Sequence, residues 1–224
     1  MQEFKFIRSF GRVKSRKLSQ NKLGLFDNIL PKYQLDLDQL NKNKFSKINL
    51  EIGFGSGDFL FENARNNPEQ LFIGSEIYIN SIGKLLDKLE KNPLNNLKIY
   101  QNDVRFLLEK LPKDFLDKIF ILFPDPWPKK RHHNRRIINE DLLKILHHIA
   151  KPNTTMLIAT DHPSYQEYLL ELLPDNEFFT LDENFYNNPN QEPDFWVKTK
   201  YQEKAIREGR KSMFFNLNYF IDQA

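Results

Sequence analysis

Short apolar runs alternate with helical segments along most of this 224-residue chain, and this alternation limits the possible folds more than any other feature. Strands that alternate with helices of about ten residues build a parallel sheet with helices on both faces and right-handed connections. We therefore predict a doubly wound α/β domain. The predicted strands are 47–52, 71–74, 97–100, 117–123, 155–160 and 213–219, and the predicted helices are 33–43, 58–65, 80–89, 104–110, 139–150 and 165–173.

Composition narrows the class of protein. With 40% hydrophobic and 13% aromatic residues, the chain can bury a full core as one domain. It has no cysteine, which excludes disulfides and thiolate metal sites. No apolar run approaches the length of a membrane span, and the N-terminus lacks the apolar core of a signal peptide. We expect a soluble, cytoplasmic protein.

The net charge of +3 is unevenly distributed. Residues 1–24 carry seven basic residues and one acid, and residues 124–138 carry five basic residues and one acid, so the rest of the chain is acidic. Two basic segments on an acidic body indicate a polyanion as partner, although such segments also occur as solvated tails and faces. We expect a basic, partly flexible extension over 1–24 and a single domain over 25–224.

A glycine-rich turn, Gly53-Phe54-Gly55-Ser56-Gly57, follows the first predicted strand and precedes a helix. A turn in this place lets the backbone approach a ligand closely. Glu76 follows the second strand, 23 residues after Gly53, where a carboxylate can bind both hydroxyls of a ribose. The arrangement predicts a cofactor that contains a nucleoside.

Two further acids identify the cofactor. The spacing G-x-G-x-G differs from the G-x-G-x-x-G of dinucleotide sites, and Glu51 before the turn repels phosphate but attracts an ammonium or a sulfonium. Asp103 follows the third strand, where it can reach an adenine amino group. These acids favour S-adenosylmethionine over NAD, although each acid alone is also explained as a helix cap.

The stretch from Phe123 to Arg136 reads Phe-Pro-Asp-Pro-Trp-Pro-Lys-Lys-Arg-His-His-Asn-Arg-Arg. Its prolines exclude helix and central strand, so it is a stiff loop at the carboxyl edge of the sheet, where ligands bind in open α/β folds. Asp125 and Trp127 beside a cationic strip predict chemistry on a base whose phosphates lie nearby. The alternative is a solvated charged face, with Trp127 packing the loop onto the sheet.

These motifs, with Thr160-Asp161 and Thr199-Lys200-Tyr201, resemble the bacterial tRNA (guanine-N7)-methyltransferase family over about residues 8 to 220. The resemblance implies a Rossmann-like class I methyltransferase fold with an antiparallel C-terminal strand. It also implies S-adenosylmethionine as cofactor, tRNA as partner, and methyl transfer to N7 of a guanine in the variable loop.

The resemblance assigns roles to individual residues. It implies that Glu51, Glu76 and Asp103 hold the amino-acid end, the ribose and the adenine of the cofactor. It also implies that Asp125 is catalytic at the boundary between cofactor and guanine and contacts the cofactor as well. The remaining assignments are Gly53, Gly55 and Gly57 in the cofactor turn, Lys129, Asp161, Thr199, Lys200, Tyr201 and Gln202 on the substrate, and Lys130, Arg131, His132, His133, Asn134 and Arg135 on RNA.

The chain departs from the family pattern at two positions. Gln202 stands where the family has Glu, so a hydrogen bond to a guanine edge would carry no charge, and Ser75 replaces an apolar residue before Glu76. The basic segment from Arg8 to Lys17 is expected to fold over cofactor or RNA.

The chemistry is consistent with these roles. Guanine N7 already carries a lone pair, so Asp125 is expected to orient the ring by accepting hydrogen bonds rather than to remove a proton. One alternative is methylation of an exocyclic amine of adenine; enzymes of that kind are expected to carry the loop Asp-Pro-Pro-(Tyr/Phe), whereas this chain reads Pro-Asp-Pro-Trp. A second alternative is a non-catalytic RNA-binding module, which would be expected to have lost the glycine turn or the acids. No histidine spacing favours a metal, and no obligatory protein partner is evident.

Overall fold

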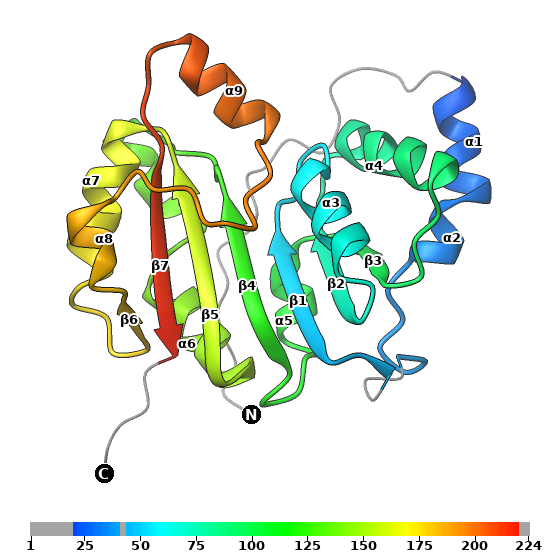
Figure 1. Ribbon diagram of the computed structural model, residues 1–224, viewed down its shortest axis with the longest axis horizontal. Helices are drawn as coiled ribbons and strands as arrows, with labels where there is room; N and C mark the ends of the chain where they lie inside the picture. Colours follow the sequence, from blue (N-terminus) through cyan, green and yellow to red (C-terminus); the bar gives the residue numbers. More distant parts are fainter. Residues whose placement is uncertain (1–19, 41–43, 220–224) are drawn as a thin grey trace.

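A seven-stranded sheet forms the centre of the computed structural model, which describes residues 20–40 and 44–219 (Figure 1). The strand order is β3-β2-β1-β4-β5-β7-β6. Strands β1 to β5 pair in parallel, whereas β7 is antiparallel to both β5 and β6. The strands are β1 (Lys47–Ile52), β2 (Gln70–Ser75), β3 (Leu97–Tyr100), β4 (Leu116–Leu122), β5 (Ala150–Thr160), β6 (Phe179–Leu181) and β7 (Met213–Tyr219). The predicted doubly wound sheet with an antiparallel C-terminal strand is confirmed.

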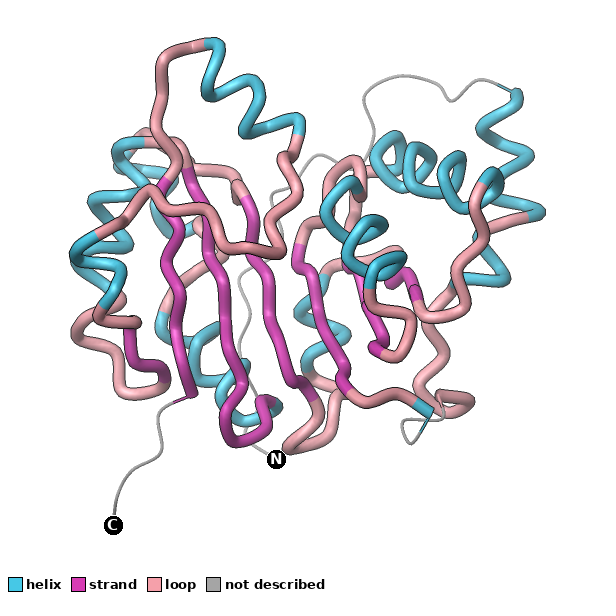
Figure 2. Tube along the Cα trace, viewed as in Figure 1, coloured by secondary structure: helices cyan, strands magenta, loops and turns pink. Residues whose placement is uncertain are grey.

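The helices cover the two faces of the sheet and bury two apolar cores (Figure 2). One face carries α1 (Gln20–Asn28), α2 (Leu30–Tyr33), α3 (Asp58–Asn66) and α4 (Ile79–Lys91). The other face carries α5 (Val104–Leu108), α6 (Glu140–Ile149), α7 (Pro163–Leu172) and α8 (Asn184–Asn187). Helix α4 shows why these segments are helical, because its buried Ile82, Leu85, Leu86 and Leu89 recur at spacings of three and four.

The strand order reverses between β1 and β4. The chain therefore leaves the carboxyl ends of these two neighbouring strands toward opposite faces of the sheet, to α3 after β1 and to α6 after β4. This is the place where open α/β sheets bind ligands. The glycine turn follows β1 and the proline loop follows β4, so the fold brings both motifs to this one point.

The predicted helix over residues 33–43 is wrong for residues 34–40, and residues 41–43 lie outside the described residues. Helix α2 ends at Tyr33, and Gln34 is extended, with ψ of 130°, and forms an isolated parallel bridge with Ile99. The Asp36 side chain then accepts hydrogen bonds from the backbone N–H groups of Asp38 and Gln39, at 3.0 and 3.3 Å. Aspartate competes with helical hydrogen bonding in this way, so a turn replaces the helix.

Several helices and strands lie in segments that were predicted as loops or for which no secondary structure was predicted. The basic strip forms a 3₁₀-helix, η2 (Lys130–Arg135), and the polar segment 182–199 contains α8. Helix α9 (Lys200–Arg207), strand β6 and helix α1 were not predicted, and β5 begins at Ala150 rather than at residue 155. The predicted extension over residues 1–24 lies outside the described residues up to residue 19, and residues 20–24 belong to α1.

Candidate active site

A cavity of about 700 Å³ lies at the carboxyl ends of the parallel strands. Strand β1 contributes Ile52, β2 contributes Ser75 and β4 contributes Ile121, so its floor lies at the reversal of strand order. Eight of the residues named above line it together: Gly53, Gly55, Glu76, Asp103, Asp125, Trp127, Arg135 and Tyr201. Motifs that are far apart in the sequence therefore form one site.

The glycine turn has a left-handed backbone at Gly53, Gly55 and Gly57, with φ of 74°, 55° and 68°. At Gly55 a Cβ atom would lie 3.1 Å from the Tyr201 ring, so the absence of a side chain keeps this wall of the cavity open. At Gly57 a Cβ atom would lie 2.9 Å from Leu85, a residue of α4. Gly57 therefore serves the packing of α3 against α4 and does not line the cavity.

Glu76 is held by the backbone of the turn and of the segment that leads into α4. Its Oε2 accepts a hydrogen bond from Gly55 N at 2.9 Å, and its Oε1 accepts from Ile77 N and Tyr78 N at 2.8 and 2.9 Å. Burial raises the pKa of Glu76 above its ordinary value, although these three bonds favour the ionised form. The carboxylate is thus fixed in orientation before any ligand arrives.

Glu51 lies in β1, two residues before the turn; it is only 3% exposed and is not among the residues that line the cavity. Its Oε2 has no hydrogen-bond partner within the described residues. Burial is the largest cause, and repulsion from Glu76 and Asp58 a smaller one, of a pKa of Glu51 that is raised to about 8. A buried carboxylate oxygen without a donor is a site where a cationic ligand group would be stabilised.

Asp103 has two partners of its own. Its Oδ1 caps α5 by accepting from Arg105 N at 3.0 Å, and its Oδ2 pairs with Arg105 Nη1 at 3.2 Å. Arg105 also lines the cavity, and the sequence motifs did not identify it. Its place in the first turn after a cavity acid was the available signal.

The proline loop has a strained backbone. Phe123 and Trp127 have φ of 51° and 44°, in the left-handed region that non-glycine residues rarely adopt, and they flank Asp125 on both sides. Asp125 stands exposed at the rim of the cavity, and partial desolvation by the cavity wall raises its pKa above 3.8. The strain and the placement both point to function at this loop.

The basic strip forms the outer side of the loop, and η2 buries none of its residues. The Arg135 guanidinium lies 5.1 Å from the centre of the Trp127 ring, and the His132 ring meets the same indole edge-on at 5.9 Å. Lys129, Lys130, Arg131, His133 and Asn134 are exposed to solvent and lie outside the cavity lining. The strip therefore borders the cavity through Arg135 and presents its other charges outward.

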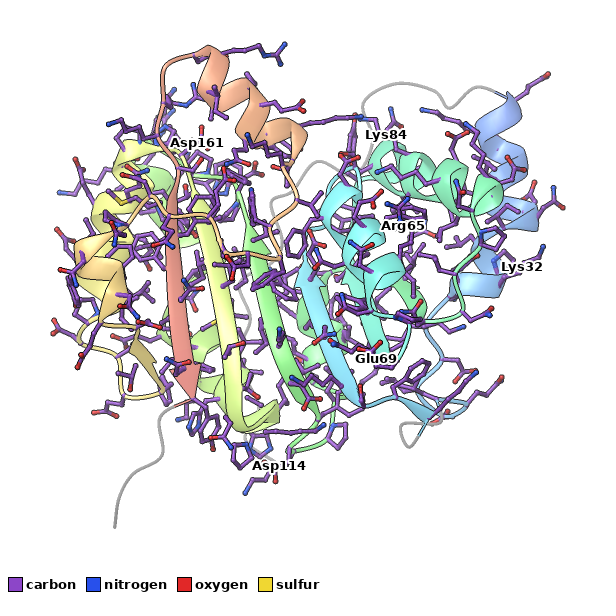
Figure 3. All side chains as sticks on the ribbon, viewed as in Figure 1. Lys32, Arg65, Glu69, Lys84, Asp114 and Asp161 are labelled. Carbon is purple, nitrogen blue, oxygen red and sulfur yellow. The ribbon has the colours of Figure 1, made fainter. Side chains whose placement is uncertain are left out.

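The remaining predicted substrate residues do not all reach the cavity. Asp161 Oδ2 accepts a hydrogen bond from Arg210 Nε at 2.6 Å, near the upper end of the sheet in Figure 3. Thr199 caps α9 through Gln202 N at 3.2 Å, and Lys200 is exposed. Of this group only Tyr201 lines the cavity.

Gln202 is buried, with 2% exposure, and both ends of its amide are bonded. Its Oε1 accepts from Trp196 Nε1 at 2.7 Å, and its Nε2 donates to Glu192 Oε1 at 2.6 Å. The structure thus places this side chain between α9 and the preceding loop, away from the cavity lining.

Two further structural properties concern only residues 20–40 and 44–219. No helix there has both the length and the apolar composition needed to cross a lipid bilayer. In the same residues no three His, Asp or Glu side chains are grouped so that they could hold a metal ion. That the protein needs no metal stays a prediction.

Comparison with known proteins adds a family to this geometry. Residues 46–215 match the family model described as "Putative methyltransferase". The chain is 35% identical to the tRNA (guanine-N(7)-)-methyltransferase of Ruegeria sp. (strain TM1040), over 90% of this chain and 83% of that protein. It is 38% identical to a bifunctional methyltransferase of Rickettsia felis, over 95% of this chain but only 40% of that longer protein.

Solved structures agree on the fold. The chain resembles an antibiotic-related methyltransferase with a TM-score of 0.59 and 21% identity, over 86% of this chain and 99% of the other. It resembles the 16S rRNA methyltransferase KamB with a TM-score of 0.56 and 15% identity, over 80% and 91% of the two chains. At these identities the likeness supports the class I methyltransferase fold alone.

Proposed function

The chain belongs to the tRNA (guanine-N7)-methyltransferase family, and on that premise we propose that it methylates N7 of a guanine in the variable loop of tRNA. The observation that carries the proposal is the single cavity that joins the glycine turn, Glu76 and Asp103 to Asp125. A cytoplasmic location, no metal and no obligatory protein partner are part of the same proposal.

The cofactor is S-adenosylmethionine, whose sulfonium supplies an electrophilic methyl group. The residues present fit it, because the unpartnered Glu51 Oε2 lies in a buried place that favours a cation. We assign Glu51 to its amino-acid end, the fixed Glu76 carboxylate to the ribose hydroxyls and Asp103 to the adenine amino group. Gly53 and Gly55 leave room for close approach to the backbone.

Asp125 acts on the guanine. Methylation at N7 moves a positive charge from sulfur to the purine ring, and no proton has to leave N7 before the bond forms. An ionised Asp125 at the rim would accept hydrogen bonds from the N–H groups of the base, fix its orientation and stabilise the new charge. Its role is therefore orientation and charge stabilisation, without proton removal.

The exposed basic residues of the strip would hold tRNA phosphates. Lys130 and Arg131 point into solvent beside the cavity, and Arg135 connects the strip to Trp127 at the cavity wall. Contacts of this kind position an RNA without reading its sequence. A base turned toward Asp125 would then pass Trp127 and Tyr201, both of which line the cavity.

The decisive experiment is methyl transfer from labelled S-adenosylmethionine to unmodified tRNA transcripts, with the product digested and its nucleosides identified. We expect 7-methylguanosine, mapped to the variable loop, and we expect the signal to disappear in Asp125→Ala. A transcript whose variable-loop guanines are replaced by adenine is the matched substrate control.

Other products would decide between the alternatives. N6-methyladenosine would contradict the assignment of the proline loop to guanine and favour methylation of an exocyclic amine. If no methyl group is transferred although S-adenosylmethionine still binds at equilibrium, the enzyme needs a component besides the tRNA transcript, or acts on another substrate. Absence of cofactor binding would favour a non-catalytic RNA-binding module.

A further inference from the structure

Arg136, the residue that follows η2, is buried to 3% exposure. A guanidinium stays charged in proteins, and burying it is costly unless it is compensated. Among the residues that the structure describes, no carboxylate forms an ion pair with it. Its compensation comes from neutral groups, and these groups identify what it does.

The guanidinium joins the proline loop to α7. Its Nε donates to the carbonyl oxygen of Pro126 at 3.1 Å, and its Nη2 donates to the carbonyl oxygen of Ser164 at 3.2 Å. Nη2 also lies 3.2 Å from His133 Nε2, and since a guanidinium only donates, that imidazole nitrogen is the acceptor. One side chain thus spans the loop, the first turn of α7 and the basic strip.

The platform under the guanidinium is fixed independently of it. This platform consists of two tyrosine rings of α7: the central carbon of the Arg136 guanidinium lies 5.2 Å from the ring centre of Tyr165 and 4.6 Å from that of Tyr168. The Tyr168 hydroxyl donates to the carbonyl oxygen of Ile138 at 2.9 Å, which ties the chain just after Arg136 to α7. Loss of the guanidinium would therefore leave its own turn in place and release the other partner, Pro126.

The Pro126 end of this hydrogen bond lies in a segment whose strained backbone needs to be held in place. Pro126 lies between Asp125 and the left-handed Trp127, and Phe123 on the far side is also left-handed. Strained backbone persists only where surrounding contacts hold it. Phe123 N donates to the carbonyl oxygen of Ala159 at 2.8 Å before Asp125, and the Arg136 contact holds the loop after it.

We propose that Arg136 is a positioning residue that holds Asp125 at the rim of the cavity by fixing the Pro126 carbonyl to α7. The kinetic part of this inference rests on the proposed methyl transfer. Because Arg136 acts through backbone position, its loss should slow the transfer step.

A structural readout tests the anchoring without any turnover. The chain has two tryptophans, Trp127 in the loop and Trp196 elsewhere, so 5-fluorotryptophan labelling gives two ¹⁹F resonances. In Arg136→Met, which keeps the bulk and removes the donors, we expect the Trp127 resonance to shift or broaden and the Trp196 resonance to stay. Arg136→Lys, which keeps the charge, should show the same change, and it serves if the Met variant does not fold.

The kinetic readout separates positioning from stability. Both variants should lower the single-turnover rate of methyl transfer by about 10²-fold, as expected for a misplaced catalytic group. Dissociation constants for S-adenosylmethionine and tRNA should stay within about threefold, because neither ligand is assigned to Arg136.

Asn96 provides a matched control. Its side chain is similarly buried, at 4% exposure, and its amide donates to the carbonyl oxygens of Ala64, Asn67 and Gln70. It does not line the cavity. Asn96→Ala should lower the melting temperature and leave both the Trp127 resonance and the single-turnover rate unchanged.

Three outcomes decide the matter. A folded Arg136→Met protein with a wild-type rate and an unchanged Trp127 resonance would overturn the proposal. So would a loss of rate that follows loss of both affinities and of melting temperature, because that is the result of general destabilisation. If the Trp127 resonance changes while even the wild-type protein methylates no tRNA, the anchoring stands and the proposed reaction fails.

Discussion

The two sides of the cavity are built by different means. The turn side comprises the turn 53–57, Glu51 behind the cavity lining, and Glu76 and Asp103 in the lining. Its acids lie in or just after β1, β2 and β3. Glu76 there is oriented by three backbone N–H groups. On the loop side, residues 123–136, a strained backbone is held by the buried side chain of Arg136, at the end of the same segment. Secondary structure positions the first side, and tertiary contacts position the second.

The comparison predicts its largest effect at Asp125. Asp125→Asn keeps the shape of the side chain but removes its negative charge, so we expect the single-turnover rate to fall by about 10²- to 10³-fold. Cofactor affinity, which belongs to the turn side, should stay unchanged in equilibrium titration. Retention of the wild-type rate would show that charge on the loop side is not needed.

The pH profile of the wild-type enzyme sharpens this test. Desolvation raises the pKa of Asp125 above 3.8, so the rate should fall as the pH drops through that raised pKa and the carboxylate is protonated. The acid limb of the profile should be absent in Asp125→Asn, because amides do not titrate. An acid limb that persists unchanged in the variant would assign it to another group.

The second effect concerns stability on the turn side. Burial raises the pKa of Glu51 from an ordinary 4.5 to about 8, so between these values the folded protein without cofactor binds a proton that the unfolded chain has lost. Stability should therefore decrease as the pH rises through this window, by as much as about 1.4 kcal/mol per pH unit. In Glu51→Gln this dependence should disappear, which denaturant unfolding at several pH values will measure.

Glu69 provides the control for Glu51. Its side chain is exposed before β2, at a labelled position in Figure 3, so Glu69→Gln removes one carboxyl without removing a buried one. The pH dependence of its stability should match the wild type. A wild-type slope in Glu51→Gln would mean that Glu51 is not buried as an acid, and the site proposed there for a cationic ligand group would be lost.

The difference between the two sides also explains what the sequence could predict. A parallel strand followed by glycine or an acid sets a position at the sheet edge by itself, so the cavity contains Gly53, Gly55, Glu76 and Asp103 as expected. Asp125 lies at the same cavity for the same reason, since its loop directly follows β4. These positions follow from local patterns alone.

The rest depends on contacts that no local pattern specifies. The ion pair between Asp161 and Arg210 joins residues 49 positions apart, and the Gln202 amide is enclosed by a loop that has little regular structure. The helix predicted at 33–43 failed because a single Asp36 side chain favours a turn. Hydrogen bonding of polar side chains, rather than periodicity, decided each of these cases.

The third prediction tests the position where the chain departs from its family. In Gln202→Glu the bond from Trp196 survives, because a carboxylate accepts, but the donor to Glu192 is replaced by a like charge. We expect a loss of about 1 to 3 kcal/mol in stability at neutral pH, partly recovered at acidic pH as a carboxyl is protonated. Gln191→Glu, at an exposed residue of the same segment, is the matched control and should change little.

The smallest effect is expected for the exposed strip, because solvent screens single charges there. Lys130→Ala or Arg131→Ala should weaken tRNA binding by about 2- to 5-fold, as expected for one exposed ion pair. The slope of log K against log salt should decrease by about 0.7 to 0.9 for each phosphate that the variant no longer neutralises. Lys32→Ala removes the same charge from α2, far from the cavity in Figure 3, and should leave the slope unchanged. If Lys32→Ala lowers the slope as much as Lys130→Ala does, the RNA follows net charge rather than the strip, and the loop side loses its outer part.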